Sequence, residues 1–474
     1  MTLALLVGAA LLGCAVGPDY VRPETASPDA WSEPLSEGLS AAAPEREALA
    51  EWWTALGDAQ LTELVRRAVR GNLDVQAAEA RVREARARRV VARSGFFPKL
   101  EASGSASRSD ASDSLRNDSA NVGGSAGANN LYSAGLDASW EIDVFGGVRR
   151  GLEAAQADVV RSEEDLRDVL VSLAAEVALS YVDARSFQAR LAIAHANLEA
   201  QEETEAIVGW RVQAGLATEL ELERARSNAA QTRAQIPSLR TSLEDARNGL
   251  AVLIGVAPGS LAAELAEPRP VPRTAREVAV GVPAQTLAQR PDVRRAEAEL
   301  VAQTARVGVA SARAYPSLTA LGSIGLEALT PGRLLDAGAS TWRLAGSTAW
   351  VVFDGGAIRG GIDAEDALRE QALAGFRSAV LLALDEVENA LVAYAQEQER
   401  LAALEDGSSA ALRAVELAQT QYGAGLVDFE IVLDSQRSLY VLQEQVAVSE
   451  RDVTSNLIRL YKALGGGWTP GVSG

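Results

Sequence analysis

The stretch YSAGLDASWEIDV, from Tyr132 to Val144, alternates apolar and polar residues with a period of two. Its even positions are Tyr, Ala, Leu, Ala, Trp, Ile and Val, whereas its odd positions include Ser, Asp and Glu. Because successive side chains of a strand point to opposite faces of a sheet, this alternation predicts a strand at about 132–145 with one apolar and one polar face.

Three other stretches alternate in the same parity and predict strands at about 99–108, 317–328 and 341–353. Alternation alone fits a soluble sandwich as well as a membrane barrel. Two features favour the barrel. The apolar face carries Tyr132, Trp140, Trp342 and Trp350 at or near strand ends, as interfacial aromatic girdles do. The acids and serines of the other face suit a water-filled lumen.

Four strands cannot close a barrel, since bacterial barrels have at least about eight. An open sheet edge in hydrocarbon would leave backbone N–H and C=O groups unpaired, at a cost of several kcal/mol each. Two or more copies of the chain must therefore pool their strands.

The chain contains an internal repeat, in which one structural unit occurs twice. Asn72–Leu100 matches Arg290–Leu318 at an offset of 218, whereas Trp140 matches Trp350 and Gly215 matches Gly425 at an offset of 210. The difference in offset lies between Pro98 and Trp140, where residues 110–130 have the Ser, Gly, Asn and Asp composition of an exposed loop.

Long helices follow each strand pair. Apolar residues recur every seven positions, which is typical of a coiled-coil seam: Leu152, Val159, Leu166 and Leu173, and then Leu373, Val380, Val387, Tyr394 and Leu401. Each run reaches a Gly-containing turn, after which a second helix returns. Thr218 and Glu221 form a predicted capping box for the first return, and Asp428 is the predicted N-cap of the other. The alternative interpretation is that these helices form solvent-exposed coiled-coil rods. Their attachment to predicted barrel strands disfavours it.

The first residues resemble a bacterial lipoprotein precursor. Residues 1–13 are apolar but too short to span a bilayer, which fits a signal peptide. Leu11-Leu12-Gly13 before Cys14 is similar to a lipobox, so Cys14 is the expected lipid anchor, and Ala15 behind it resembles lipoproteins sent to the outer membrane. The alternative is a small buried cysteine.

Composition excludes several functions. Cys14 is the only cysteine, and one His and one Met leave almost no ligands for a soft metal, so no metal site or cofactor is expected. The net charge of −19 argues against nucleic acid and against a basic membrane-surface patch. No phosphate loop or catalytic triad appears, and His195 reads as a helix-surface residue, so an enzyme is not expected.

Taken together, GCAVGPDYVRP, EWWTALGDAQLTELV, RPDVRRAEAEL, YPSL, VLDSQRSLY and LYKALGGGW look like the TolC-type outer-membrane efflux proteins. The resemblance is to the OprM-like lipoprotein branch and covers nearly the whole chain. It implies a mixed α and β membrane protein: a homotrimer with a 12-stranded barrel, a periplasmic helical barrel and an equatorial mixed domain, in the outer membrane of a Gram-negative bacterium.

The resemblance also implies partners and sites. Such proteins are passive exit ducts for drugs or other small toxic compounds, joined to a periplasmic adaptor and an inner-membrane RND-type pump. By this resemblance Asp434, Arg437 and Glu430 form the periplasmic gate. The tips of the helical hairpins that contact the adaptor are Gly215, Leu216, Gly425 and Leu426. Other readings are a duct for type I protein secretion or metal-ion efflux, and a non-conducting structural envelope lipoprotein.

The predicted organisation follows from these features. An extended, lipidated segment at 14–57 comes after the signal peptide. The first repeat at 58–257 has its helical hairpin at 148–255, and a linker follows at 258–283. The second repeat at 284–467 has its hairpin at 357–464, and a tail closes the chain at 468–474.

Overall fold

The computed structural model describes residues 15–24, 28–35, 38–42, 45–110, 129–273 and 278–468. The signal peptide predicted at 1–13 and the anchor residue Cys14 lie outside these residues. The chain divides into two compact units. The described residues within Met1–Pro23, Val82–Arg161 and Ala296–Phe376 form the sheet unit, and those within Glu24–Arg81, Ser162–Arg295 and Arg377–Gly474 form the hairpin unit.

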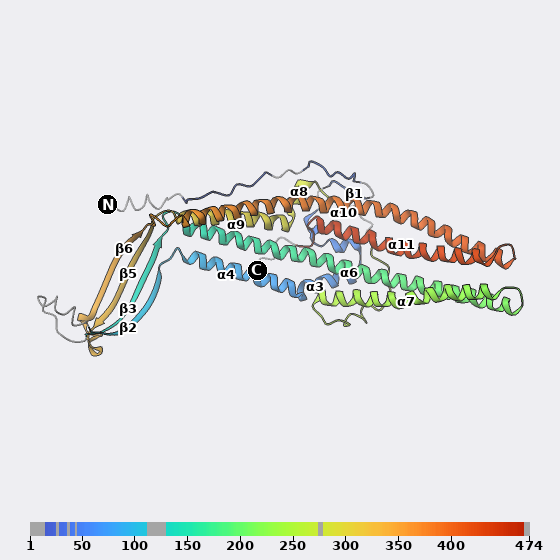
Figure 1. Cartoon of the computed structure of the whole chain (residues 1–474), viewed down its shortest axis with the longest axis horizontal. Helices are drawn as coiled ribbons and strands as arrows, with labels where there is room; N and C mark the ends of the chain where they lie inside the picture. Colours follow the sequence, from blue (N-terminus) through green and yellow to red (C-terminus); the bar gives the residue numbers. More distant parts are fainter. Residues whose placement is uncertain are drawn as a thin grey trace. The chain divides into compact units, whose positions relative to one another are not determined.

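The sheet unit contains a four-stranded antiparallel sheet in the order β2-β3-β5-β6 (Figure 1). Strand β2 spans Lys99–Ser109, β3 Asn129–Ile142, β5 Ser317–Ala328 and β6 Ser340–Ala349. The strands predicted at 99–108 and 317–328 are therefore found almost to the residue. Two short 3-10 turns, η2 (Pro331–Arg333) and η3 (Ala337–Ala339), join β5 to β6.

The other two predicted strands end earlier than expected. Strand β3 stops at Ile142 because Asp143 turns to accept hydrogen bonds from the backbone N–H groups of Val148 (3.1 Å) and Arg149 (2.9 Å). Strand β6 stops at Ala349, the partner of Ser317, because β5 has no earlier residue with which to pair. The extensions to 145 and 353 were wrong, and both errors lie where a strand gives way to a helix.

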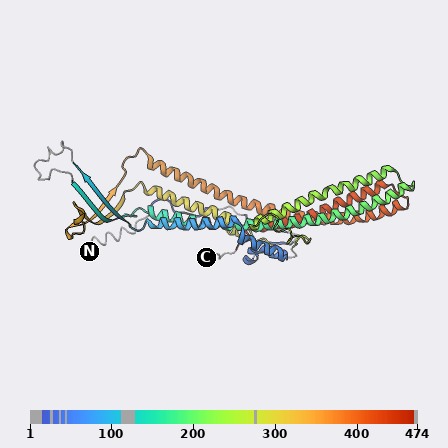
Figure 2. The ribbon, with the colours of Figure 1, turned by 90° about the horizontal axis from the view of Figure 1, so that it is seen from below.

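Helices lead into and out of the strands, as Figures 1 and 2 show. Helices α4 (Leu73–Ser94) and α9 (Pro291–Ala312) each lead into a strand, whereas α6 (Gly147–Gln213) and α10 (Ala357–Gly423) each follow one. The long helices α6 and α10 have 67 residues each. No helix in the described part of the chain combines the length and the hydrophobicity needed to cross a membrane.

Two return helices complete the hairpins. Helix α7 spans Glu219–Ile254 and α11 spans Phe429–Ala463. The predicted capping box is confirmed, since the Thr218 side chain accepts from the Glu221 N–H and the Glu221 side chain accepts from the Thr218 N–H. Asp428 occupies the N-cap position of α11, but its side chain makes no capping hydrogen bond, so that prediction was only half right.

The predicted seam residues lie in the packed faces of the long helices. Val159, Leu173, Val380, Val387 and Tyr394 are all buried. In a long helix this spacing of buried residues keeps one stripe against its neighbours, so the heptads build packed hairpins rather than exposed rods.

A large apolar core lies in the hairpin unit. It is formed by the long helices and by short elements: α2 (Arg46–Ala50), η1 (Trp52–Leu56), α3 (Ala59–Gly71), and the parallel pair β1 (Leu39–Ser40) and β4 (Val278–Ala279). A further short helix, α8, spans Pro283–Gln289. Trp52 is fully buried and its ring stacks on that of Tyr461 at 5.2 Å. Asp58 caps α3 by accepting from the backbone N–H of Leu61.

Candidate functional site: a two-faced sheet and two hairpin ends

The register of the sheet separates apolar from polar side chains. Residues of even number pair with one another across all strands, for example Leu136 with Ile324 and Ile324 with Trp342. Glu101 pairs in the same way with Asp137, which accepts a hydrogen bond from the Ser103 hydroxyl (2.7 Å). The apolar face is open to the surroundings, since Ile324 is 64% and Trp342 81% exposed in the single chain. The sheet therefore has one face suited to lipid and one suited to water.

The two edge strands, β2 and β6, each pair with only one neighbour within the described residues. Their outer N–H and C=O groups need partners wherever water is scarce. Since β2 and β6 stand at opposite edges of the sheet, further copies of the chain can continue the ladder from edge to edge.

The two hairpins end in turns of the same geometry. Gly215 and Gly425 adopt positive φ angles of 73° and 74°, a conformation that favours glycine. The N–H of Leu216 donates to the Arg211 carbonyl (2.7 Å), and the N–H of Leu426 donates to the Gln421 carbonyl (2.9 Å). These bonds satisfy the last carbonyls of α6 and α10.

The predicted tip residues thus lie at the turns themselves. Leu216 is 69% exposed and Leu426 is 75% exposed, so both turns present an apolar side chain outward. Behind the turns a small core joins the two hairpins, with Val208, Ala225, Phe429, Val432 and Leu433 among its buried members. The Arg211 guanidinium lies over the Tyr422 ring, 4.5 Å from its centroid.

The predicted gate residues lie on α11 close to this end. Glu430 accepts from Arg224 of α7 at 3.3 Å, and the Nε atom of Arg437 donates to Oδ1 of Asn228, also on α7, at 3.0 Å. Asp434 lies between them in the sequence and is exposed. The structure therefore ties Glu430 and Arg437 to the other hairpin, and it does not bring Arg437 into an ion pair with Asp434 among the described residues.

Sequence reasoning missed the residue that meets Arg437. Asn228 is 3% exposed, and its Nδ2 atom has no hydrogen-bond partner among the described residues. Gln436 on α11 is also buried and donates to the Thr204 hydroxyl of α6 (2.9 Å). The only signal in the sequence was a pair of amides in otherwise apolar stripes, which does not specify the partner.

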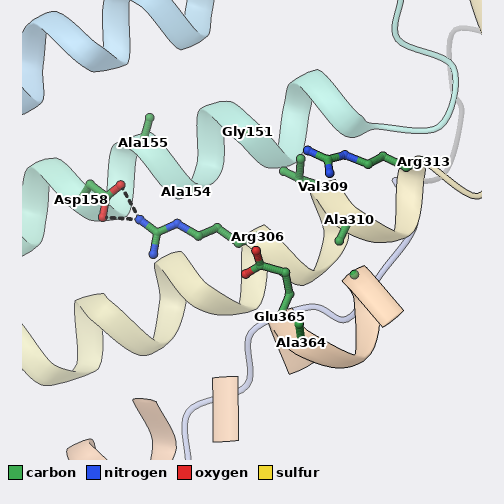
Figure 3. A pocket seen from close by; sticks show the side chains of 11 residues that line it. Gly151, Ala154, Ala155, Asp158, Arg306, Val309, Ala310, Arg313, Ala364 and Glu365 are labelled. Atoms are coloured by element: carbon green, nitrogen blue, oxygen red, sulfur yellow. Dashed lines mark hydrogen bonds and ion pairs between the residues drawn. The ribbon is translucent and has the colours of Figure 1, made fainter. Parts of the chain in front are cut away.

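A cavity of about 440 Å³ lies in the sheet unit between α6, α9 and α10 (Figure 3). The Arg306 guanidinium on its wall binds both carboxylate oxygens of Asp158, at 2.8 and 2.9 Å. Glu365 accepts a hydrogen bond from Gln303 (2.6 Å). The charged groups of Asp158, Arg306 and Glu365 are thus already matched within the chain, whereas the side chain of Arg313, which also lines the cavity, has no partner among the described residues. Elsewhere, His195 is exposed on α6, as predicted.

A sheet with one apolar and one polar face, incomplete at both edges and continuous with long helical hairpins, defines the protomer of an outer-membrane channel. The sequence model of the outer membrane efflux proteins matches residues 64–256 and 282–466. The chain therefore belongs to the outer membrane efflux protein family.

Individual relatives match over almost the whole chain. The pyoverdine export outer membrane protein OpmQ of Pseudomonas putida is 34% identical over 465 residues, which cover 97% of this chain and 95% of OpmQ. Nodulation protein T of Rhizobium leguminosarum is 32% identical over 460 residues, covering 97% and 96%. The solved outer-membrane channel OprN superposes with a TM-score of 0.90 at 34% identity, over 96% of this chain and 100% of that one.

These findings confirm the predicted family, fold class and location. The protein is a trimeric outer-membrane efflux channel of a Gram-negative bacterium, in which the sheets of three copies form a 12-stranded barrel and the long helices form a periplasmic helical barrel. It acts as the outer-membrane exit duct of a tripartite efflux system. The roles of the gate and tip residues stay predictions.

Proposed function

We propose that this channel passively conducts drugs or other small toxic compounds, which it receives from a periplasmic adaptor and an inner-membrane RND-type pump. The observation that supports passive conduction best is the polar face of the sheet. Glu101, Asp137 and Ser323 lie on one face and offer water-compatible groups to a passing cargo. The energy for transport then comes from the pump.

The adaptor contact is proposed at the hairpin tips Gly215, Leu216, Gly425 and Leu426. The glycines fix tight turns, and the leucines project from them as exposed apolar groups. Exposed apolar side chains on a rigid turn lose little conformational freedom when they are buried by a partner. The tips therefore combine accessibility with preorganisation.

The periplasmic gate is proposed at Asp434, with Arg437 and Glu430 holding α11 against α7. In a trimer three copies of Asp434 would face one another around the axis and form an acidic ring. Like charges in a narrow pore focus the electric field and favour cations.

The class of cargo rests on relatives. The relatives are named for pyoverdine export, for toluene efflux and for cation efflux. Small organic compounds fit this channel best, because two of these three names concern organic molecules. Duct functions in metal-ion efflux or type I protein secretion, and a non-conducting structural role, are the alternatives to be tested. The proposed anchor is an N-terminal lipid on Cys14.

The proposal is tested in cells that lack their own efflux channel but retain an adaptor and an RND pump. Expression of this chain should restore resistance to organic toxins. Leu216→Arg with Leu426→Arg should abolish that resistance while the trimer persists. Leu335→Arg is the matched control, because Leu335 is 87% exposed but lies between β5 and β6. Resistance that is equal with and without the channel would contradict the proposal.

A further inference from the structure

Unpartnered arginines occur where the helices meet the sheet. Arg89 and Arg93 lie in the last two turns of α4, Arg313 follows the last residue of α9, and Arg359 lies in the first turn of α10. All four are exposed. Among the described residues none of their side chains has a hydrogen-bond or ion-pair partner. They belong to one compact unit and lie at one end of its sheet.

The strongest local charge lies at the end of α4. The segment RARRVVARSGFFPK, residues 86–99, contains five basic residues and no acidic one, in a chain whose net charge is −19. Arg88 pairs with Glu84 (2.7 Å) and Lys99 with Glu101. Arg89 and Arg93 keep their charge unmatched. The net charge of the whole chain argues against a basic membrane-surface patch, but a net charge does not show where positive charge is locally concentrated, as it is in this segment.

Aromatic side chains gather at the same junction. The Phe145 ring stacks on the Tyr315 ring at 4.8 Å, and Trp350 donates to the Ala314 carbonyl at 3.1 Å. Phe97 is 60% exposed and Phe353 is 90% exposed. Amphipathic aromatic rings favour the level of the lipid headgroups, and basic residues favour an anionic membrane surface.

We propose that Arg89, Arg93, Arg313 and Arg359 bind the headgroups of anionic phospholipids in the leaflet that faces the periplasm. The guanidinium fork matches phosphate oxygens in a bidentate geometry. Arg93 lies about 1.5 Å along the helix axis from the end of α4, and Arg89 about 7.5 Å. A headgroup layer is roughly 5–8 Å thick on each side of the hydrocarbon core. Both arginines therefore fall within that layer or at its edge.

The competing occupant is a second copy of the chain. Helix α10 carries the exposed acids Asp363 and Glu370, which a neighbouring protomer could place against these arginines. The two interpretations predict different losses when the arginine charges are removed. Lipid binding predicts a lost headgroup preference in an intact trimer, whereas contact between copies predicts a weakened trimer.

The test uses purified full-length trimer equilibrated with equal amounts of phosphatidylglycerol and phosphatidylcholine, followed by mass spectrometry of the lipids that stay bound. Two variants remove two charges each: Arg89→Gln with Arg93→Gln, and Arg313→Gln with Arg359→Gln. The matched control is Arg240→Gln with Arg413→Gln. These are exposed arginines of α7 and α10 in the hairpin unit, also without partners among the described residues.

The wild type should retain phosphatidylglycerol in preference to phosphatidylcholine. Each junction variant should lower that preference on the order of 25-fold, because it removes two basic residues and each contributes roughly fivefold near an anionic surface. The control should behave as the wild type. An unchanged preference in both junction variants would overturn the proposal. Dissociation of either variant into monomers would also overturn it and assign the arginines to contacts between copies.

Discussion

Nη1 of Arg224 lies 3.3 Å from Oε2 of Glu430, and this ion pair links the return helix of one hairpin to that of the other. The two side chains are 46% and 74% exposed. Exposed pairs of this kind contribute about 0.2–1 kcal/mol. The hydrogen bond from Arg437 to Asn228 is a second polar link between the same helices. Breaking the links that hold the proposed gate therefore costs little free energy.

Removal of the gate charges should change conduction. Asp434→Ala combined with Arg437→Ala should raise single-channel conductance in planar bilayers and weaken cation selectivity, because the acidic ring and its tie to α7 are both lost. Asp406→Ala with Arg413→Ala, two exposed residues of α10, is the matched control. Wild-type conductance and selectivity in an intact double variant would show that these residues are not the constriction.

The anchor prediction concerns Cys14, which lies outside the described residues. Cys14→Ser should abolish incorporation of labelled palmitate, because the cysteine thiol is the acceptor of the lipid. The trimer should still assemble if the barrel alone retains it in the membrane. Label that persists in the serine variant would remove Cys14 as the anchor.

Residues 110–130, most of which lie outside the described residues, are predicted to form an extracellular loop. An epitope inserted near Gly124 should be tolerated and should be detected by antibody on intact cells, because the repeats differ in length there. The same epitope placed after Ala257, between the repeats, should require permeabilised cells. The opposite pattern would invert the assigned topology.

The buried carboxyl group of Glu164 predicts a pH dependence of stability. Its side chain is fully buried and accepts a hydrogen bond from Arg167, with Arg294 2.7 Å away. Burial raises the pKa of Glu164, although both arginines lower it. The folded protein then binds a proton at this group more readily than the unfolded chain does. Its contribution to stability is greatest at low pH and declines as pH rises from the unfolded value towards the raised one.

Glu164→Gln should remove this decline. The melting temperature of the wild type minus that of the variant should therefore fall as pH rises from about 4.5, the ordinary pKa of a glutamate. Glu399→Gln, at an exposed position of α10, is the control. A difference that stays constant or grows with pH would mean that burial does not dominate at Glu164.

Trp52 should be one of the most sensitive core positions. Trp52→Ala should lower the free energy of unfolding by about 3–5 kcal/mol, because it removes a fully buried ring stacked on Tyr461 and leaves a cavity. Trp52→Phe keeps an aromatic ring and should cost less. The melting temperatures of the detergent-solubilised trimers check this order, and equal losses would contradict it.

The sequence predicted the features that depend on neighbouring residues. Alternation placed β5, and a local capping box placed the start of α7. Sequence-based prediction failed where a partner distant in the sequence determines where an element ends or what a side chain contacts. Strand β6 ends at Ala349 because its partner β5 begins at Ser317, and Arg437 meets Asn228, which lies 209 positions earlier. A single polar residue in the apolar stripe of a helix does not indicate which helix it will contact.

The two hairpin turns share one backbone geometry but not one chemistry. At equivalent positions beyond the turns, the first hairpin carries Leu220, which is 61% exposed, and the second carries Glu430. Around a threefold axis the two kinds of end must alternate. A docking partner therefore meets a ring of hairpin ends. Every end has the same backbone shape, but the same side chains recur only at every second end. Such a ring can bind one type of partner in two non-identical modes.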